Sequence, residues 1–266
     1  MSFQTKKLNN ETVGEIPLKK PKDTRPVKGW KLFPEMNANI FMCARKKSGK
    51  STVIFKSLQK CCGKNTKIIV FCATLHKDAS WIAIKDWAVE HGLTFIGHES
   101  IKDDDGVDQL ELLIKELQAK VEDEEAPKEK SCLDSDDEEE PKERKSKYQS
   151  PEYVFILDDL SNELQTKTIP RLLKVNRHFK SKTIISTQWW NDLHPMSRKQ
   201  ADYFILFRGH SAKKLEEIYR DANLSIPLEK FWQIYKFATK EPFSFLYVDC
   251  ASGEFRRNFN ELIEFD

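Results

Sequence analysis

A short stretch of small and basic residues could hold the phosphates of a nucleotide. It fits the P-loop pattern G-x-x-x-x-G-K-S/T at every fixed position except the first, and it comprises Ala44, Arg45, Lys46, Lys47, Ser48, Gly49, Lys50, Ser51 and Thr52. In such a loop, successive backbone N–H groups converge on an anion. Lys50 is then expected to reach the β- and γ-phosphates, and the Ser51 hydroxyl to coordinate Mg²⁺. Ala44 stands where the pattern has its first glycine, and the alternative interpretation is a basic turn that matches by chance.

Two adjacent carboxylates follow an apolar segment later in the chain. Residues 154–157 are Val-Phe-Ile-Leu, and Asp158 and Asp159 come directly after them. Ligands of open α/β sheets bind beside the carboxyl ends of the strands, so both side chains are predicted to face the bound phosphates. Asp158 is expected to hold Mg²⁺ through water, and Asp159 to orient or deprotonate the attacking water. The alternative role for Asp159 is a helix cap or turn residue, because residues 160–162 are Leu-Ser-Asn.

A polar amide at the end of another predicted strand is the third chemical feature. Residues 183–187 are Thr-Ile-Ile-Ser-Thr, and Gln188 follows them. Beside the strand of Asp158, this amide can lie near the γ-phosphate and the attacking water, although taken alone it would be an ordinary polar strand end. Trp189 and Trp190 come next, and core packing is favoured for them over stacking on bases.

Several arginines could supply positive charge to a phosphoryl-transfer transition state, a role that a neighbouring subunit often fills. Arg177, just before the predicted strand at 182–186, is the first choice. The other candidates are Arg171, Arg198 and Arg208. For any one of these arginines, the alternative is a surface residue or one that faces DNA.

These residues need a scaffold that brings strand ends together, and the sequence indicates one. Apolar runs alternate with segments of helical spacing, which is typical of an α/β fold with a mainly parallel sheet and helices on both faces. Strands are predicted near residues 39–43, 67–73, 93–96, 153–157, 182–186 and 203–207, helices near 53–61, 80–91, 109–121, 164–178, 213–221 and 228–235, and a closing C-terminal hairpin at 243–248 and 254–259.

The chain is predicted to divide into an arm and one large domain. Residues 1–35 form a basic N-terminal arm that docks through Trp30 and Phe33, and residues 36–266 form the P-loop ATPase domain. Within this domain, residues 122–150 are rich in Glu, Asp, Lys and Ser and are predicted to be a disordered acidic insert. Most runs of this kind are solvated loops, and a minority mimic nucleic acid or dock partners.

Charge is unevenly distributed, although the formal net charge is only +2. An acidic insert beside a basic arm and a basic stretch at 167–220 is compatible with nucleic-acid binding. The 6 cysteines lack the paired spacing of a zinc site or a disulfide framework. No signal peptide is visible, and no apolar run reaches the length of a membrane span. We therefore expect a soluble, intracellular protein with no membrane partner.

Together, the segments 44–52, 154–159, 176–178 and 183–188 resemble the motifs of the poxvirus-type genome-packaging ATPases of large DNA viruses and virus-like transposons, in order and in spacing. These proteins belong to the FtsK/HerA-like group of DNA pumps. The resemblance extends over roughly residues 36–260. It implies a RecA-like P-loop NTPase core with an extra strand between the Walker strands. It also implies ATP and Mg²⁺ as ligands and a pentameric or hexameric ring that threads double-stranded DNA into a capsid.

The resemblance also implies roles for individual residues. Lys50 and Ser51 would bind the phosphates and Mg²⁺, and Asp158 and Asp159 would be the Walker-B pair. Gln188 would be the sensor of the γ-phosphate, and Arg177 the possible arginine finger. The alanine at the first loop position and the long acidic insert depart from the family pattern.

The leading hypothesis is an ATP-driven translocase that packages a viral or virus-like genome, with a capsid or portal protein as a further partner. Basic residues are expected to face the DNA, namely Arg198, Lys199, Lys213 and Lys214. One alternative is a P-loop nucleotide or polynucleotide kinase, which would need an acceptor pocket and a lid with several arginines. The other is a non-enzymatic nucleotide switch, in which Asp159 serves only as a cap.

Overall fold

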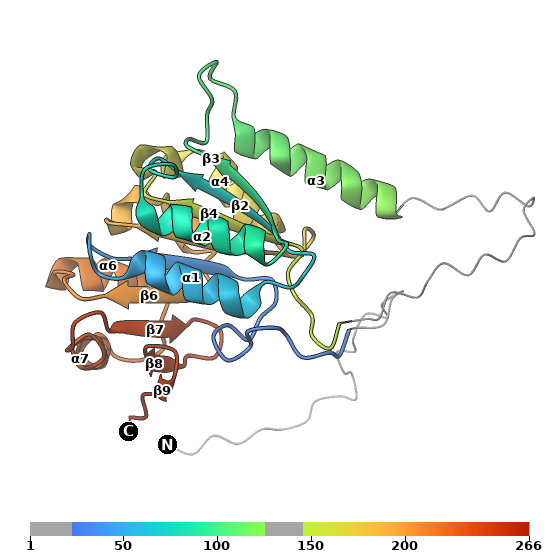
Figure 1. Cartoon of the computed structure of the whole chain (residues 1–266). Coiled ribbons are helices and arrows are strands. Elements are labelled where there is room, and N and C mark those ends of the chain that lie inside the picture. Colours follow the sequence, from blue (N-terminus) through green and yellow to red (C-terminus); the bar gives the residue numbers. More distant parts are fainter. Residues whose placement is uncertain (1–22, 126–145, 266) are drawn as a thin grey trace, which may run out of the picture.

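The computed structural model describes residues 23–125 and 146–265, and a 9-stranded sheet forms its centre. The strands are β1 (Asn39–Cys43), β2 (Lys67–Cys72), β3 (Thr94–His98), β4 (Tyr153–Asp158), β5 (Ser181–Thr187), β6 (Tyr203–Phe207), β7 (Phe245–Asp249), β8 (Phe255–Arg257) and β9 (Glu261–Leu262). Among the described residues they lie in the order β3-β2-β4-β5-β1-β6-β7-β8-β9 (Figure 1).

The sheet is mainly parallel, as the sequence predicted. All pairings among β1 to β6 are parallel, and β1, β5 and β6 are buried along their whole length. Strands covered on both faces require continuous apolar runs, which explains the pattern of the sequence. The last strands pair antiparallel and form the predicted closing hairpin. The strand β1 leads into the phosphate loop, and β4 ends at Asp158. Because β5 lies between β1 and β4, an extra strand separates these two strands.

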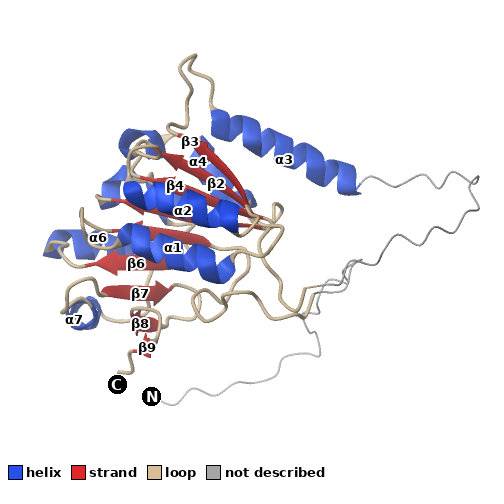
Figure 2. Cartoon of the chain, in the orientation of Figure 1, coloured by secondary structure: helices blue, strands red, loops and turns tan. Residues whose placement is uncertain are grey.

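Helices cover both faces of the sheet (Figure 2). On one face, α1 (Lys50–Cys61) and α2 (Ala79–Glu90) bury Ile54, Leu58 and Trp81 against one side of the strands. The opposite face packs against a second apolar cluster. Its helices are α3 (Gln109–Glu125), α4 (Thr168–Val175), α6 (Ala212–Ala222) and α7 (Leu228–Ala238), and the shorter elements are α5 (Pro195–Arg198), η1 (Ser161–Gln165) and η2 (Trp190–Asp192).

The structure differs from the sequence prediction in three elements. The long helix predicted at 164–178 is instead η1 followed by α4, with Thr166 in an extended conformation between them. Pro170 lies in the first turn of α4, where its missing N–H costs no helical hydrogen bond. The strand predicted at 93–96 occupies Thr94–His98, and α3 continues beyond Val121 to Glu125.

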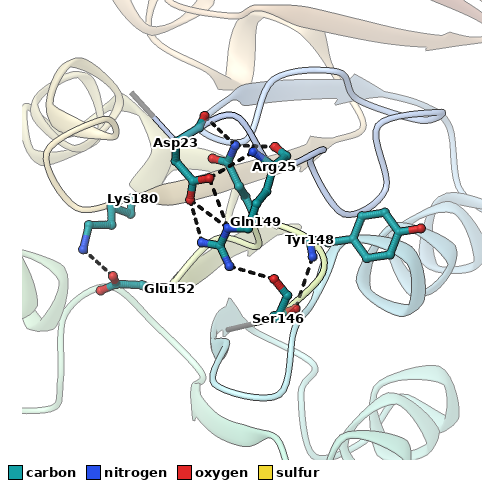
Figure 3. Close-up of polar contacts among 7 residues, drawn as sticks. All are labelled: Asp23, Arg25, Ser146, Tyr148, Gln149, Glu152 and Lys180. Atoms are coloured by element: carbon teal, nitrogen blue, oxygen red, sulfur yellow. Dashed lines mark hydrogen bonds and ion pairs between the residues drawn. The ribbon is translucent and has the colours of Figure 1, made fainter. Parts of the chain in front are cut away.

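The described part of the N-terminal arm packs onto the domain. Phe33 is fully buried, with its ring 5.3 Å from that of Tyr203, whereas Trp30 remains half exposed. Further back, Arg25 and Gln149 join the arm to the segment that precedes β4: the Arg25 guanidinium donates to the Ser146 carbonyl at 2.8 Å (Figure 3). The arm residues 1–22 and most of the predicted acidic insert, 126–145, lie outside the described residues.

Within the described ranges, no helix combines the length and the apolar character that crossing a membrane would need. The same ranges hold no cluster of His, Cys, Asp and Glu side chains suited to a metal ion. The five described cysteines are free, and four of them are buried, namely Cys43, Cys61, Cys62 and Cys72. Burial raises the pKa of each of these four thiols. These thiols are therefore inert parts of the core rather than nucleophiles.

Candidate nucleotide-binding site

The phosphate loop lies between β1 and α1, as its pattern requires. Gly49 adopts a left-handed conformation with φ 97° and caps the N-terminus of α1, where its carbonyl accepts from the Val53 N–H at 3.1 Å. Lys47 is also left-handed, with φ 61°, and the Ser48 hydroxyl donates to the Arg45 carbonyl at 2.5 Å. A helix N-terminus preceded by such a turn presents free N–H groups to an anion.

Ala44 fits the position where the loop pattern has a glycine. It is buried, and its N–H donates to the Thr187 carbonyl at 3.0 Å, which extends the pairing of β1 with β5 by one residue. Its φ is not positive. Only left-handed backbone or a very close approach requires glycine, so alanine is accommodated here without strain.

Asp158 ends β4 directly beside Lys50. Its Oδ1 lies 3.8 Å from Lys50 Nζ, and both side chains are largely buried. The indole N–H of Trp81, on α2, donates to Asp158 Oδ2 at 3.2 Å and fixes the orientation of the carboxylate. Trp81 was not predicted as a site residue, because its spacing is that of an ordinary apolar helix residue.

Two opposing effects act on the pKa of the Asp158 carboxyl. Burial raises its pKa above the usual value of 3.8, and the positive charge of Lys50 opposes that rise. A carboxylate desolvated in this way interacts strongly with cations, because water screens it poorly. The site therefore favours a second positive charge beside Asp158.

Asp159 and Gln188 form a direct pair at the same edge of the sheet. The Gln188 side-chain amide donates to Asp159 Oδ1 at 2.6 Å. Asp159 has a φ of 55°, and its own N–H donates to the Ser186 carbonyl, at the end of β5, at 3.2 Å. Aspartate tolerates this left-handed conformation better than most residues. The turn swings the Asp159 side chain from β4 towards the residue that follows β5.

Comparison with solved structures identifies proteins of similar fold. The chain is similar to the genome packaging NTPase B204 of Sulfolobus turreted icosahedral virus 2, solved with AMP, with a TM-score of 0.51, 20% identity and coverage of 84% of this chain and 98% of B204. The fold is that of the B204 packaging NTPase. A second match, described as the DNA-packaging ATPase B204 of Sulfolobus turreted icosahedral virus, has a TM-score of 0.51 and 20% identity, over 84% of this chain and 97% of that one.

Sequence comparison adds one distant relative. Uncharacterized protein 075L of Invertebrate iridescent virus 6 is 28% identical over 109 residues, which are 40% of this chain and 42% of that protein. The match thus spans less than half of the relative. No protein-family model matches the chain.

The oxygens at the end of β4 fit a hydrated Mg²⁺. Asp158 Oδ1 is buried and has no hydrogen-bond partner among the described residues, which leaves a lone pair to be satisfied. Ser51 lies in the first turn of α1, directly after Lys50. Mg²⁺ takes oxygen ligands and keeps several waters, so one carboxylate, one hydroxyl and substrate phosphates suit it. Asp158 and Ser51 are the residues that would hold the ion.

Arg177 does not lie at this site. It is exposed in the turn that precedes β5, and its charge acts on Asp202, which precedes β6. Both positions are at the amino edge of the parallel strands, whereas the phosphate loop is at the carboxyl edge. The seven residues of β5 separate the two edges by about 20 Å, so Arg177 cannot reach the phosphate loop of its own subunit.

The two tryptophans after Gln188 differ in burial, so the predicted core packing applies to only one of them. Trp190 is fully buried, and its indole N–H donates to Asp221 Oδ2 at 2.9 Å, which confirms core packing. Trp189 is 67% exposed, so the expected core packing is wrong for this residue. The short strand-to-helix turn can bury only one of the two rings.

The prediction that Arg198 faces DNA is also wrong. Arg198 is only 8% exposed, and its Nε lies 3.2 Å from Asp221 Oδ2. Its guanidinium also stacks over the Trp190 ring. It is a structural cation of the core, because a buried arginine needs such a partner. Lys199 and Lys213 are exposed, and Lys214 is paired with Glu217 at 2.6 Å.

Proposed function

We propose that this chain is an ATPase that moves double-stranded DNA into a viral or virus-like capsid. The observation that carries the proposal is the convergence of Lys50, Asp158 and the hydrogen-bonded pair of Asp159 and Gln188 at one edge of the sheet. The similarity in fold to B204, which is described as a genome packaging NTPase and was solved with ATP-gammaS, supports it.

The loop and Lys50 bind the triphosphate. The N–H groups at the start of α1 would face the β- and γ-phosphates, and Lys50 adds a positive charge that Asp158 holds beside the site. Mg²⁺, held by Asp158 and Ser51, would neutralise negative charge on the phosphates. Positive charge that is positioned before the reaction lowers the barrier, because it requires no reorganisation in the transition state.

Asp159 and Gln188 act on the attacking water. The Asp159 carboxylate orients the water and accepts its proton, while Gln188 restrains Asp159 through the 2.6 Å hydrogen bond. Because Gln188 lies just after the last residue of β5, outside the paired strand, a small change in the loop that follows β5 would break or restore this bond. We infer that Gln188 couples the state of the γ-phosphate to the rest of the subunit.

The motor function needs contacts with DNA and with other subunits. The exposed cations Lys199 and Lys213 supply contacts with DNA phosphates. A pentameric or hexameric ring would place these cations around the DNA, with a capsid or portal protein as its docking partner. We place this activity inside the host cell, at the site where capsids are filled.

Steady-state ATP hydrolysis with and without long double-stranded DNA tests the proposal. We expect turnover with Mg²⁺ and a several-fold stimulation by DNA. Lys50→Ala should abolish turnover, because the phosphate-binding charge is lost. Lys60→Ala serves as the matched control, since Lys60 lies exposed in the last turn of the same helix, and it should leave the rate unchanged.

Each alternative function has a distinct outcome in the same assays. Phosphoryl transfer from ATP to nucleosides or to 5′-hydroxyl ends, without net hydrolysis, would identify a kinase instead. Nucleotide binding without any turnover would identify a switch. Hydrolysis that DNA does not alter would support the ATPase and contradict the DNA motor.

A further inference from the structure

An aromatic residue occupies a strained position in the turn before β7. Residues 241–244 are Glu-Pro-Phe-Ser, and the Ser244 N–H donates to the Glu241 carbonyl at 3.3 Å. Phe243 has a φ of 63°. Proline at the second position and positive φ at the third are the features of a type II turn, which normally carries glycine or asparagine at the third position. A bulky side chain with positive φ is a genuine outlier.

The Phe243 ring gains nothing from the core in return for this strain. It is 72% exposed, the most exposed of the large apolar side chains in the described ranges. The surroundings nonetheless hold the turn in place. Buried Ser244 donates its hydroxyl to the Glu241 carbonyl at 2.7 Å, and Arg257 Nη2 lies 2.7 Å from Glu241 Oε2. Strain that the neighbouring structure enforces is characteristic of functional sites.

The turn lies at the edge of the sheet that carries the phosphate loop. Because β7 runs antiparallel to β6, with Phe245 opposite Phe207, the start of β7 is at the carboxyl end of the parallel strands. Phe243 Cδ1 is 3.7 Å from the point where a Cβ on Gly49 would lie. The exposed ring therefore stands directly beside the glycine that caps α1.

The two sides of the phosphate loop are filled differently. Asp158, Trp81 and Gln188 occupy the side of β4 and β5, where the γ-phosphate and its water must lie. The other side, towards β7, carries the exposed Phe243 ring beside Gly49. A largely apolar cavity of about 870 Å³, lined by Thr52, Val53 and Phe245 but not by Phe243, lies next to it. With its γ-phosphate on the first side, a nucleotide directs its base to the second, where Phe243 stands.

We propose that the Phe243 ring is the platform on which the base of the bound nucleotide stacks. This inference rests on the proposed function, because it concerns the base of the nucleotide whose phosphates the loop is proposed to bind. A single exposed aromatic face recognises a flat base through stacking and tolerates different bases. The site therefore takes purine nucleoside triphosphates without strong preference for adenine, and purines in preference to the smaller pyrimidines.

Binding measured by calorimetry, with two ligands, tests the assignment. ATP-gammaS carries a base and inorganic tripolyphosphate does not, so only the first can stack. Phe243→Ala should weaken ATP-gammaS binding roughly ten- to a hundredfold, the range for a lost aromatic–base stack, and should leave tripolyphosphate binding unchanged. Phe243→Leu should behave like Phe243→Ala, whereas Phe243→Trp should keep the wild-type affinity.

Two controls separate stacking from structural effects. Trp189→Ala removes a similarly exposed aromatic side chain at the same sheet edge on the γ-phosphate side, and it should leave the affinity for both ligands unchanged. Phe243→Gly suits the positive φ of the turn, so it should keep or raise the temperature of unfolding while binding ATP-gammaS as weakly as Phe243→Ala.

The outcomes that overturn the assignment are distinct from failure of the proposed function. Unchanged ATP-gammaS affinity in Phe243→Ala would show that the base does not stack on the ring. An equal loss for both ligands would show that Phe243 only supports the loop. If the wild-type protein bound neither ligand, the nucleotide site itself, and with it the proposed function, would be wrong.

Discussion

Asp158 illustrates how a single buried carboxylate can favour function over stability. Its environment raises its pKa mainly through burial, and the nearby Lys50 compensates only partly. The folded protein therefore binds a proton at this position more readily than the unfolded chain does. Stability contributed by such a group falls as the pH rises above the usual value of 3.8. The charged form that the proposed chemistry needs is the form that the fold disfavours.

Asp158→Asn should therefore make the protein more stable and inactive. At pH 7 the variant should unfold at a higher temperature than wild type, because it removes a desolvated charge while keeping the acceptor for Trp81. The difference should vanish towards pH 3, where the wild-type carboxyl is protonated in both states. ATP turnover should fall roughly a hundredfold or more, the scale seen when one preorganised electrostatic contact is lost. Thermal unfolding at both pH values and a turnover assay check this; equal or lower stability at pH 7 would contradict it.

At the residue level, motif order predicted which side chains come together. Lys50 lies beside Asp158, and Gln188 donates to Asp159, because all four residues follow or end parallel strands at the same edge of the sheet. Trp81 and Phe243 could not be found this way. Each reaches the site from an element that carries no motif, and its position depends on the path of the chain in space rather than on local sequence.

Among the elements, the loop after β6 links the phosphate loop to the opposite face of the sheet. His210 Nε2 donates to the Cys43 carbonyl at 3.3 Å, at the end of β1, and the His210 N–H donates to the Tyr235 hydroxyl on α7 at 3.1 Å. A Cβ on Gly209 would lie 2.9 Å from Arg45 Nε, so the loop and the phosphate loop are in close contact. The ends of β1 and β6 and the helix α7 are thus joined through one residue, His210, which uses its imidazole for β1 and its backbone N–H for α7.

This junction should weaken in acid. Burial lowers the pKa of His210 from 6.5 to about 4; the hydrogen bond to Cys43 opposes the shift, and Arg45 and Lys214 add to it. Below pH 6.5 the unfolded chain takes up a proton that the folded chain excludes, so stability falls as the pH decreases towards 4. The slope reaches at most about 1.4 kcal/mol per pH unit. His210→Asn should flatten the stability profile between pH 6.5 and 4 in chemical denaturation, whereas mutation of exposed His178 should not. Parallel profiles for wild type and His210→Asn would contradict the assignment.

Helix boundaries show where sequence patterns were insufficient. The apolar spacing of residues 164–178 suits one long helix, yet Pro170 lacks the N–H that a helix beginning at Leu164 would use. The chain resolves this conflict by extending at Thr166 and starting α4 at Thr168. Buried parallel strands such as β4 were easier to predict, because a short uninterrupted apolar run in an α/β protein is typical of a strand that is buried on both faces.

For the whole molecule, strand order decides which predicted residues can cooperate. Alternating strands and helices indicate a parallel sheet, but they do not specify that β5 lies between β1 and β4 or that β7 returns beside β6. That order brings the phosphate loop, Asp158 and Gln188 to one edge. It also places Arg177 at the opposite edge, about 20 Å away by the length of β5. Arg177 can therefore serve as an arginine finger only for a neighbouring subunit.

Mixing two inactive variants tests this arrangement. Arg177→Ala keeps an intact phosphate site but donates no finger, and Lys50→Ala keeps the finger but cannot bind phosphate productively. If Arg177 acts across a subunit interface of the proposed ring, each variant alone should lose most of its DNA-stimulated ATPase activity. Mixed rings should recover part of it, because a Lys50→Ala subunit can donate Arg177 to the intact site of its neighbour. Turnover measured across mixing ratios should rise and then fall. Full activity of Arg177→Ala alone, or a mixture no more active than its components, would exclude Arg177 as the finger and leave the exposed Arg208 as the next candidate.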